Sequence, residues 1–316
     1  MRNNFVSPGP LTTPVLFLIF NRPDTTQKVF NAIRQAKPKQ LFVAADGPRK
    51  DKEGEKEKCE QVRKVIEQVD WDCEVKTLFR DKNLGCKIAI SSVIDWFFEN
   101  VKEGIILEDD CLPSQSFFWF CQELLEYYRD NRRIMMISGT NFQFGKARGE
   151  GSYYFSIYAH ISGWATWKRA WRNYDVKIKN FKEFKKENKI KDIFVIKQQQ
   201  KYFMNILQQL YDDYDDKIGA WDYQWAYTCL VNNGLCIMPN VNIVSNIGFG
   251  PDSTHMKDKS SIFSETEARE IINIIHPNFV LADQEADLLI SKLFFGNVNI
   301  FTRVKNKMVR KIRDII

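Results

Sequence analysis

The sequence lacks the patterns that mark several common classes of protein. Its seven cysteines are odd in number and include no Cys-x-x-Cys pair, which argues against a zinc site and against a disulfide framework. We therefore expect reduced thiols in a cytoplasmic protein. No stretch approaches about 18 consecutive apolar residues, and no apolar run precedes Pro14, so neither a spanning helix nor a signal peptide is predicted. There is no internal repeat.

A strong charge excess is also missing. The 46 basic and 40 acidic residues give a net charge of +6, which is too small to indicate a nucleic-acid-binding protein, and we expect no nucleic acid partner. Apolar residues, in contrast, are plentiful. With 44% hydrophobic and 14% aromatic residues, a chain of 316 residues can bury the core of one large domain or two small ones.

Short apolar segments alternate with helix-like segments through the first 140 residues. This alternation predicts an α/β fold with a mostly parallel central sheet flanked by helices. Ligands of such sheets bind beyond the carboxyl ends of the strands, so the loops that follow the strands are the place for a site. The expected strands are 14–20, 40–46, 73–79, 104–109 and 133–139, and the expected helices are 24–36, 56–69, 86–100 and 114–129.

The pattern changes beyond residue 150. Trp164, Trp167 and Trp171 have the spacing of one helical face, which predicts a helix packed mostly in the core. A second helical stretch, rich in lysine and glutamine, is expected over about 180–213. Two charged segments are interpreted as solvated: residues 47–64 as a loop that leads into an exposed helix, and the aspartates of 212–216 as an acidic turn.

Three consecutive carboxylates, Glu108, Asp109 and Asp110, follow one of the apolar segments directly. Acidic residues at the end of a strand are often only turn or cap residues. Three together repel one another unless a cation lies among them, and oxygen ligands suit Mg²⁺ or Mn²⁺, which bind substrate phosphates as well. The triplet therefore predicts a metal-assisted nucleotide-diphosphate site, a pattern that also serves a nucleotidyltransferase or a phosphatase.

Several longer motifs occur in a fixed order. They are PVLFLIFNRPD, VAADG, RDKNLGCKIAISSVIDWFF, GIILEDDCLPSQSFFWFCQELLEYY and IMMISGTN, followed by SGWATWKRAWRNYD, GAWDYQWAY and NIGFGPDSTHM. This series resembles the GT-A glycosyltransferases of the N-acetylglucosaminyltransferase I type and their bacterial relatives that build surface glycans. The resemblance implies a GT-A domain over 14–256, with a nucleotide-binding half at about 14–140 and an acceptor half at about 141–256. Residues 1–13 would form an N-terminal tail and 257–316 a C-terminal helical extension.

The resemblance implies an inverting enzyme that moves a sugar from a UDP-sugar donor to a glycan or lipid-linked acceptor. The acidic triplet matches the family's variant of the DXD motif, so Asp110 would bind Mn²⁺ (or Mg²⁺), while Glu108 and Asp109 would contact the nucleotide-sugar. Asp222 matches the family's catalytic base. Its neighbours Trp221 and Trp225 would form a wall for the acceptor, although tryptophans at this spacing otherwise pack in a core.

The same likeness gives roles to further residues. Arg22, Asp46, Asn83, Lys87 and Thr254 would contact the nucleotide-sugar, through its phosphates, ribose or uracil. Without the resemblance, Arg22 is an ordinary solvated loop arginine and Asp46 an ordinary turn residue.

Two more roles come from the resemblance. Trp164 would border the acceptor site, and His255 would contact metal or phosphate or else be a solvated loop residue. The glycines and proline of the segment before His255 are typical of a mobile lid. The chain departs from the family at Ser91, where the relatives have a histidine.

The C-terminal residues have an amphipathic pattern. Ile300, Val304, Met308, Ile312 and Ile315 share one helical stripe among basic residues. Such a helix either binds an anionic membrane or packs on the protein's own core. In the first case the membrane surface is a partner, and this cytoplasmic protein lies at the inner face of the membrane.

Two other functions stay open. The first is sugar-nucleotide synthesis by nucleotidyl transfer, against which the lack of a glycine-rich loop after the first strand counts. The second is a non-catalytic protein that binds glycans or membranes.

Overall fold

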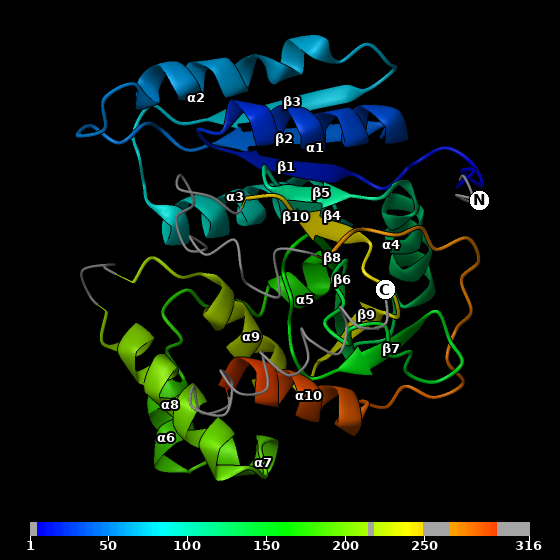
Figure 1. Cartoon of the computed structure of the whole chain (residues 1–316). Helices are drawn as coiled ribbons and strands as arrows, with labels where there is room; N and C mark the ends of the chain where they lie inside the picture. The colour runs from blue at the N-terminus through cyan, green and yellow to red at the C-terminus, as the bar shows by residue number, and fades with distance from the viewer. Residues whose placement is uncertain (1–4, 214–217, 249–265, 296–316) are drawn as a thin grey trace, which may run out of the picture.

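The computed structural model describes residues 5–213, 218–248 and 266–295. At its centre lies an eight-stranded sheet with the order β3-β2-β1-β4-β8-β6-β9-β7 (Figure 1). A small second sheet pairs β5 (Cys111–Pro113) with β10 (Val244–Asn246). The strands of the large sheet are β1 (Val15–Ile19), β2 (Gln40–Ala45), β3 (Glu74–Phe79), β4 (Glu103–Glu108), β6 (Ile134–Ser138), β7 (Tyr153–Ser156), β8 (Trp164–Trp167) and β9 (Leu235–Pro239).

Most neighbouring strands of the large sheet are parallel. β1 to β4 all run in one direction and β6 is parallel to β9, whereas β8 and β7 are antiparallel to their neighbours. Val15 and Phe17 of β1 point to one face and Leu16 and Leu18 to the other, so helices must cover both faces. The predicted α/β class, with a mostly parallel sheet flanked by helices, is confirmed.

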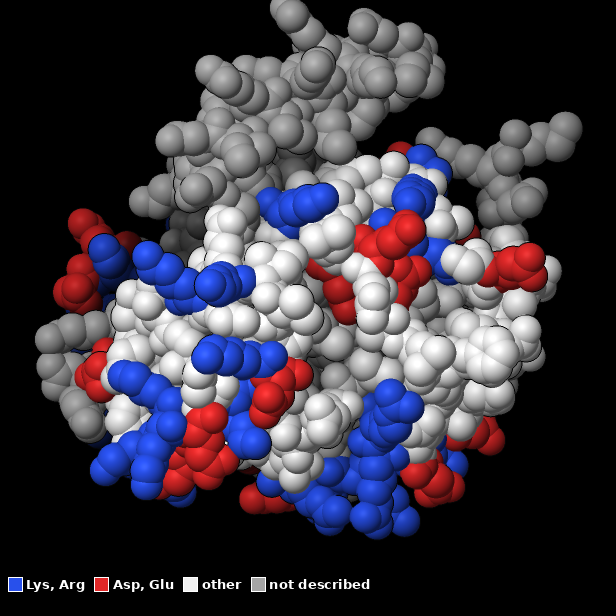
Figure 2. All heavy atoms as spheres, turned by 90° about the horizontal axis from the view of Figure 1, so that it is seen from below, with Lys and Arg blue, Asp and Glu red and all other residues white. Residues whose placement is uncertain are grey.

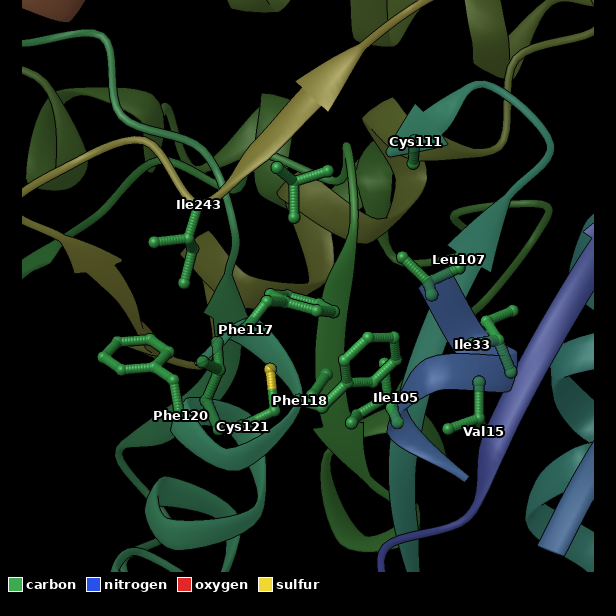
Figure 3. Packing of buried hydrophobic residues seen from close by; sticks show 14 of the residues in the cluster. Val15, Ile33, Ile105, Leu107, Cys111, Phe117, Phe118, Phe120, Cys121 and Ile243 are labelled. Atoms are coloured by element: carbon green, nitrogen blue, oxygen red, sulfur yellow. The ribbon is translucent and has the colours of Figure 1, made fainter. Parts of the chain in front are cut away.

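The two faces have separate apolar cores. On one face pack α1 (Pro23–Ala36), α2 (Glu55–Arg63) and α4 (Gln115–Tyr127), and on the other α3 (Cys86–Asn100), α5 (Lys168–Trp171) and α9 (Asp222–Val231). A short 3₁₀ helix, η1 (Lys64–Gln68), follows α2. Figure 3 shows aromatic side chains of α4, among them Phe118, together with Val15 and Ile105, which are partners in the β1–β4 ladder.

The predicted helix through the tryptophans of 164–171 is wrong in its first half. Trp164 belongs to the core on one face of the sheet, whereas Ala165 and Trp167 belong to the other. This alternation has the period of a strand, and β8 pairs with β4 and β6. Only 168–171 are helical.

A third apolar cluster joins helices below the sheet in Figure 1. The helical stretch expected over 180–213 is divided into three helices, with Asn188 in the left-handed backbone region (φ 56°) where the first ends. The cluster joins one side of α9 to α6 (Phe181–Lys186), α7 (Ile190–Ile193), α8 (Lys197–Tyr211) and α10 (Gln284–Phe295).

Residues 266–283, which we call the strap, run along the outside of the domain without helices. At their start, the carbonyl of Thr266 accepts hydrogen bonds from Asn242 Nδ2 (3.0 Å) and Ser245 Oγ (2.9 Å). Further along, the Glu270 carboxylate accepts the backbone N–H of Ser116 at the start of α4 (2.7 Å).

The second half of the strap is held by His276. Its ring stacks on Tyr127 at 3.9 Å between centroids, and its Nδ1 lies 2.8 Å from the hydroxyl of Tyr153. The described part of the expected C-terminal extension thus packs on the domain, while the basic stretch 300–315 lies outside the described residues. Among the helices that the structure describes, none is long and apolar enough to cross a membrane.

Candidate active site

The loops after β1, β2 and β4 lie side by side. β1 lies between β2 and β4, and all three strands are parallel, so their carboxyl ends meet at one edge of the sheet. This edge carries Arg22 before α1, Asp46 after β2 and the acidic triplet after β4. The topology therefore brings these polar residues together at the edge where ligands of such sheets bind.

The acidic triplet is partly withdrawn from water. Glu108 ends β4 and is half-buried, and Asp109 is 8% exposed. Asp109 Oδ2 accepts the backbone N–H of Phe20 at 3.1 Å. Arg22 Nη1 lies 2.7 Å from Asp110 Oδ2 and 3.6 Å from Asp109 Oδ1. One guanidinium thus lies against a cluster of three carboxylates.

The triplet's pKa values reflect this crowding. Burial raises the pKa of Glu108 to about 8, and the negative charges of Asp110, Asp109 and Asp222 add to the effect. Burial also raises the pKa of Asp109 to about 7, with the charge of Asp110 adding to it and Arg22 opposing it. The site therefore holds more negative charge than the surrounding protein compensates.

The donor chemistry of the triplet fits a hard divalent cation. All its donors are carboxylate oxygens, and a cation would relieve the repulsion that raises the pKa of Glu108 and Asp109. Within the described residues no three His, Cys, Asp or Glu side chains are arranged as a metal cluster.

The small sheet brings backbone directly onto Asp110. The N–H of Ile247 donates to the Asp110 carbonyl at 2.8 Å, and the N–H of Gly248 donates to Asn246 Oδ1 at 2.9 Å. A Cβ at Gly248 would lie 2.3 Å from Asp110 Oδ2. Only glycine permits this approach, so the segment after β10 is closely fitted to the acidic triplet.

Asp46 connects two loops of the same edge. Its Oδ2 accepts the N–H of Leu84 at 2.9 Å and of Gly85 at 3.2 Å, and Asn83 Nδ2 donates to the Gly47 carbonyl at 2.8 Å. Burial raises the pKa of Asp46, although these N–H groups oppose the shift. The carboxylate positions the start of α3; contact of Asp46 and Asn83 with a nucleotide stays a prediction.

Lys87, in the first turn of α3, is mostly buried and its Nζ lies 3.7 Å from Asp213 Oδ2. The Asp213 side chain is 6% exposed and accepts the N–H of Ile218 at 3.0 Å. The interpretation of 212–216 as a solvated turn is therefore wrong for Asp213, because its carboxylate has a cationic neighbour in a buried position. Residues 214–217 lie outside the described residues.

Asp222 is the first residue of α9. Its negative charge is one of the causes that raise the pKa of Glu108, after burial and the charges of Asp110 and Asp109. It also lines a cavity of about 240 Å³ between β10, the segment after β7 and helices α8 to α10. Aromatic and aliphatic side chains form most of the cavity wall, among them Tyr158, Tyr202, Phe203, Tyr223, Leu230 and Phe294.

His160 is the imidazole in the cavity wall. Burial lowers its pKa to about 4, so the ring is neutral near pH 7. Its Nε2 is buried and has no hydrogen-bond partner in the part of the chain that the structure describes. Tyr202 and Tyr223 add a pair of hydroxyls 3.0 Å apart. The cavity thus combines an apolar wall with a few polar atoms, as small-molecule sites do.

The three tryptophans predicted to contact the acceptor lie in the core. Trp164, Trp221 and Trp225 are 0%, 3% and 0% exposed. The ring centroid of Trp164 lies 5.9 Å from that of Trp221 and 5.8 Å from that of Trp225. The expected acceptor wall is wrong because these rings pack on one another and leave no surface for a sugar. Their contribution is to fix the start of α9, and with it Asp222.

Two other predicted residues, Thr254 and His255, lie outside the described residues. In contrast, the sequence did not point to Glu55, which is 4% exposed and accepts hydrogen bonds from Asn21 Nδ2 (2.8 Å) and the Arg49 N–H (2.7 Å). The expectation of a wholly solvated segment over 47–64 is wrong at this position, because Glu55 joins that segment to the loop of Arg22. Nothing distinguishes Glu55 from its charged neighbours in the sequence. His160 was missed for a similar reason, since a lone histidine carries no pattern.

No protein-family model matches the chain, and no curated protein sequence is significantly similar to it. Among solved structures it is similar to a cytidylyltransferase from Leptospira borgpetersenii serovar Hardjo-bovis (strain JB197), with 12% identity and a TM-score of 0.32. That match covers 52% of this chain and 64% of the cytidylyltransferase. HddC from Yersinia pseudotuberculosis has 9% identity and a TM-score of 0.31, over 50% of this chain and 78% of HddC. Similarity this low does not bear on the reaction.

Proposed function

We propose that the chain is an inverting glycosyltransferase that takes a sugar from a nucleoside diphosphate, most simply UDP, with the help of a divalent cation. The observation that carries the proposal is the position of Asp222. This carboxylate lines the 240 Å³ cavity, and its negative charge acts on Glu108 of the acidic triplet. A base between a phosphate-type site and an acceptor-sized cavity is the arrangement that inverting transfer needs.

In the proposed reaction the acceptor hydroxyl gives its proton to Asp222 as its oxygen attacks the anomeric carbon. The bond between that carbon and the diphosphate oxygen breaks, and the nucleoside diphosphate leaves with the electron pair. Because the attack comes from the face opposite the leaving group, the configuration at the anomeric carbon inverts. The cavity holds a glycan or lipid-linked acceptor with its hydroxyl toward Asp222, and its apolar wall excludes water that would hydrolyse the donor.

At the other side of the site, Asp110 would hold Mn²⁺ or Mg²⁺. When bound, the cation offsets the negative charge that develops on the leaving diphosphate. Glu108 and Asp109 would contact the sugar and ribose. Arg22, now against Asp110, is a planar donor that fits a phosphate oxygen when the cation takes its place beside the carboxylate.

The experiment measures nucleoside diphosphate released from a panel of UDP-sugars, with Mn²⁺ or with EDTA. We expect slow hydrolysis of one donor by the wild type, loss of this activity in EDTA, and loss in Asp110→Asn. Asp222→Asn should bind the donor normally by calorimetry but transfer the sugar to an acceptor about 10²- to 10⁴-fold more slowly, the range for removal of a general base.

The matched control is Asp130→Asn, the same substitution at an exposed carboxylate just after α4. It should behave as the wild type. Normal transfer by Asp222→Asn would refute the assignment of the base, and binding of a UDP-sugar with no turnover in any condition would instead identify a non-catalytic glycan-binding protein. If no UDP-sugar binds, the panel is repeated with GDP-, CMP- and dTDP-sugars.

A second candidate is nucleotidyl transfer from a nucleoside triphosphate to a sugar phosphate. The acidic triplet suits its metal-bound phosphates as well. The two reactions differ in their products, since nucleotidyl transfer releases pyrophosphate. Pyrophosphate release from a nucleoside triphosphate and a sugar phosphate, without hydrolysis of any nucleotide-sugar, would decide for this candidate.

A further inference from the structure

Residues 175–201, from the turns before α6 to the start of α8, form a charged surface that the proposed reaction does not use. We call it the lysine surface. It has nine lysines and four acidic residues, a surplus of five positive charges in a chain whose total surplus is six. Figure 2 shows Lys and Arg side chains gathered on the left of the lower face, where α6 to α8 lie in Figure 1. All nine lysines are exposed: Lys177, Lys179, Lys182, Lys185, Lys186, Lys189, Lys191, Lys197 and Lys201.

The acidic residues of the lysine surface do not cancel this charge. Lys189 Nζ lies 3.9 Å from Glu187 and 3.4 Å from Asp192. Two of the four carboxylates are thus paired with the same lysine. All three side chains of these pairs are at least half exposed, and such pairs hold each other weakly. The remaining lysines keep a field that attracts anions.

An apolar pair projects from the middle of the lysine surface. Val195 is 93% exposed and Ile196 is 40% exposed, in the turn between α7 and α8. Phe194, directly before them, is 2% exposed and anchors the turn in the apolar cluster beneath. Lys191 and Lys197 flank the pair along the chain. Because Phe194 fixes the turn, Val195 and Ile196 stay exposed, and their transfer out of water would be favourable.

We propose that the lysine surface docks on an anionic lipid membrane, with Val195 and Ile196 entering the headgroup region. Lysines attracted to anionic lipids, beside aliphatic side chains that insert, are the two components of interfacial binding. Nucleic acid fits less well. Residues 175–201 contain no arginine, whose planar guanidinium binds phosphates through two N–H groups. The three phenylalanines of this segment are buried, so it has no exposed aromatic ring that could stack on a base.

Membrane docking here is independent of the proposed reaction, but the two sites share a helix. α8 carries Lys197 and Lys201 on the lysine surface, and the next residues, Tyr202 and Phe203, line the cavity beside Asp222. A membrane-bound chain would therefore hold the cavity close to the lipid surface.

The experiment is co-sedimentation of the full chain with vesicles of phosphatidylcholine alone or mixed with phosphatidylglycerol. We expect binding to the anionic vesicles only, weakened by salt. Each lysine near such a surface contributes about 1 kcal/mol, so Lys182→Ala/Lys186→Ala should lower the partition coefficient roughly thirtyfold. Val195→Ser/Ile196→Ser should lower it at least about tenfold, with its salt dependence kept.

The matched control is Lys56→Ala/Lys58→Ala, which removes two exposed lysines from α2 at the opposite end of the molecule in Figure 1. It should bind as the wild type does, and unchanged thermal unfolding of all variants would show that they fold. The proposal is overturned if the α6 variant binds like the wild type, as it would if residues 300–315 carried the binding, or if neutral vesicles bind equally well. It is also overturned if vesicles do not bind and an RNA oligonucleotide does.

Discussion

At the residue scale, the acidic triplet lowers the stability of the folded protein when it is ionised, because its carboxylates are buried and repel one another. Glu108 and Asp109 have pKa values near 8 and 7 in the folded protein, far above those of carboxylates in an unfolded chain. Between about pH 4 and pH 8 the folded state therefore binds more protons than the unfolded state. It follows that the free energy of unfolding contributed by these groups falls as the pH rises through this range.

We predict that the melting temperature in EDTA decreases from pH 5 to pH 8. Mn²⁺ should restore it, and more at pH 8 than at pH 5, because the cation binds the deprotonated carboxylates of the folded state. Differential scanning fluorimetry at matched ionic strength gives the measurement.

The control for this prediction is Glu108→Gln. It should have a flatter dependence of melting temperature on pH and a smaller response to Mn²⁺. The interpretation fails if wild type and Glu108→Gln respond to pH and Mn²⁺ in the same way, since the effect would then come from other buried groups such as Asp287, whose pKa burial raises to about 6.

The sequence alone singles out Glu108, Asp109 and Asp110 as candidates, because three carboxylates after an apolar run form a local pattern. It could not show that Arg22 lies against Asp110 or that Gly248 covers it. Those contacts join residues far apart in the chain, and no single segment carries a signal for them.

At the element scale, predictability depended on whether the local pattern had one interpretation. The five expected strands agree with β1, β2, β3, β4 and β6 to within a residue or two, because apolar runs of strand length between turn residues have few alternatives. Trp164 and Trp167 fit both a helix and a strand. Residues 164–167 form a strand because they pair with β4 and β6, which are distant in the sequence.

The start of α4 offers a test of how an element depends on a distant segment. Ser114, at the N-cap position, makes no capping hydrogen bond with its side chain, whereas Glu270 of the strap accepts the N–H of Gln115 (3.1 Å) and of Ser116 (2.7 Å). We predict that Glu270→Ala lowers the free energy of unfolding by about 1–2 kcal/mol, the range for loss of a charged cap. Urea denaturation measures this.

The conservative variant Glu270→Gln should lose less, since its amide oxygen still accepts an N–H, and Glu267→Ala on an exposed strap position serves as the control. An equal loss in Glu270→Ala and Glu267→Ala would mean that the strap, and not the cap, is responsible.

At the scale of the whole molecule, the cysteines report on the integrity of both cores. Cys59, Cys111, Cys121, Cys229 and Cys236 are buried, the first three on the α1–α4 side and the last two near α9. Burial raises the pKa of Cys59 to about 11, which further slows its reaction. The expectation of unpaired thiols, made from the sequence, agrees with these positions.

We predict that a thiol reagent labels Cys86 rapidly in the folded protein, Cys73 more slowly because burial raises its pKa, and the other five only on unfolding. Stopped-flow absorbance with an aromatic disulfide reagent follows the phases. Cys86→Ser should remove the fast phase alone. Rapid labelling of three or more thiols under native conditions would contradict the packing of the two cores.

Gly248 and Thr266 are held close to the small sheet. Gly248 packs against Asp110, and the Thr266 carbonyl accepts a hydrogen bond from Ser245, three positions before Gly248. Both contacts depend on the small sheet, because Ser245 belongs to β10 and the partner strand β5 begins at Cys111, directly after Asp110. A substitution that separates β5 from β10 should therefore shift Gly248 and Thr266 together relative to the acidic triplet.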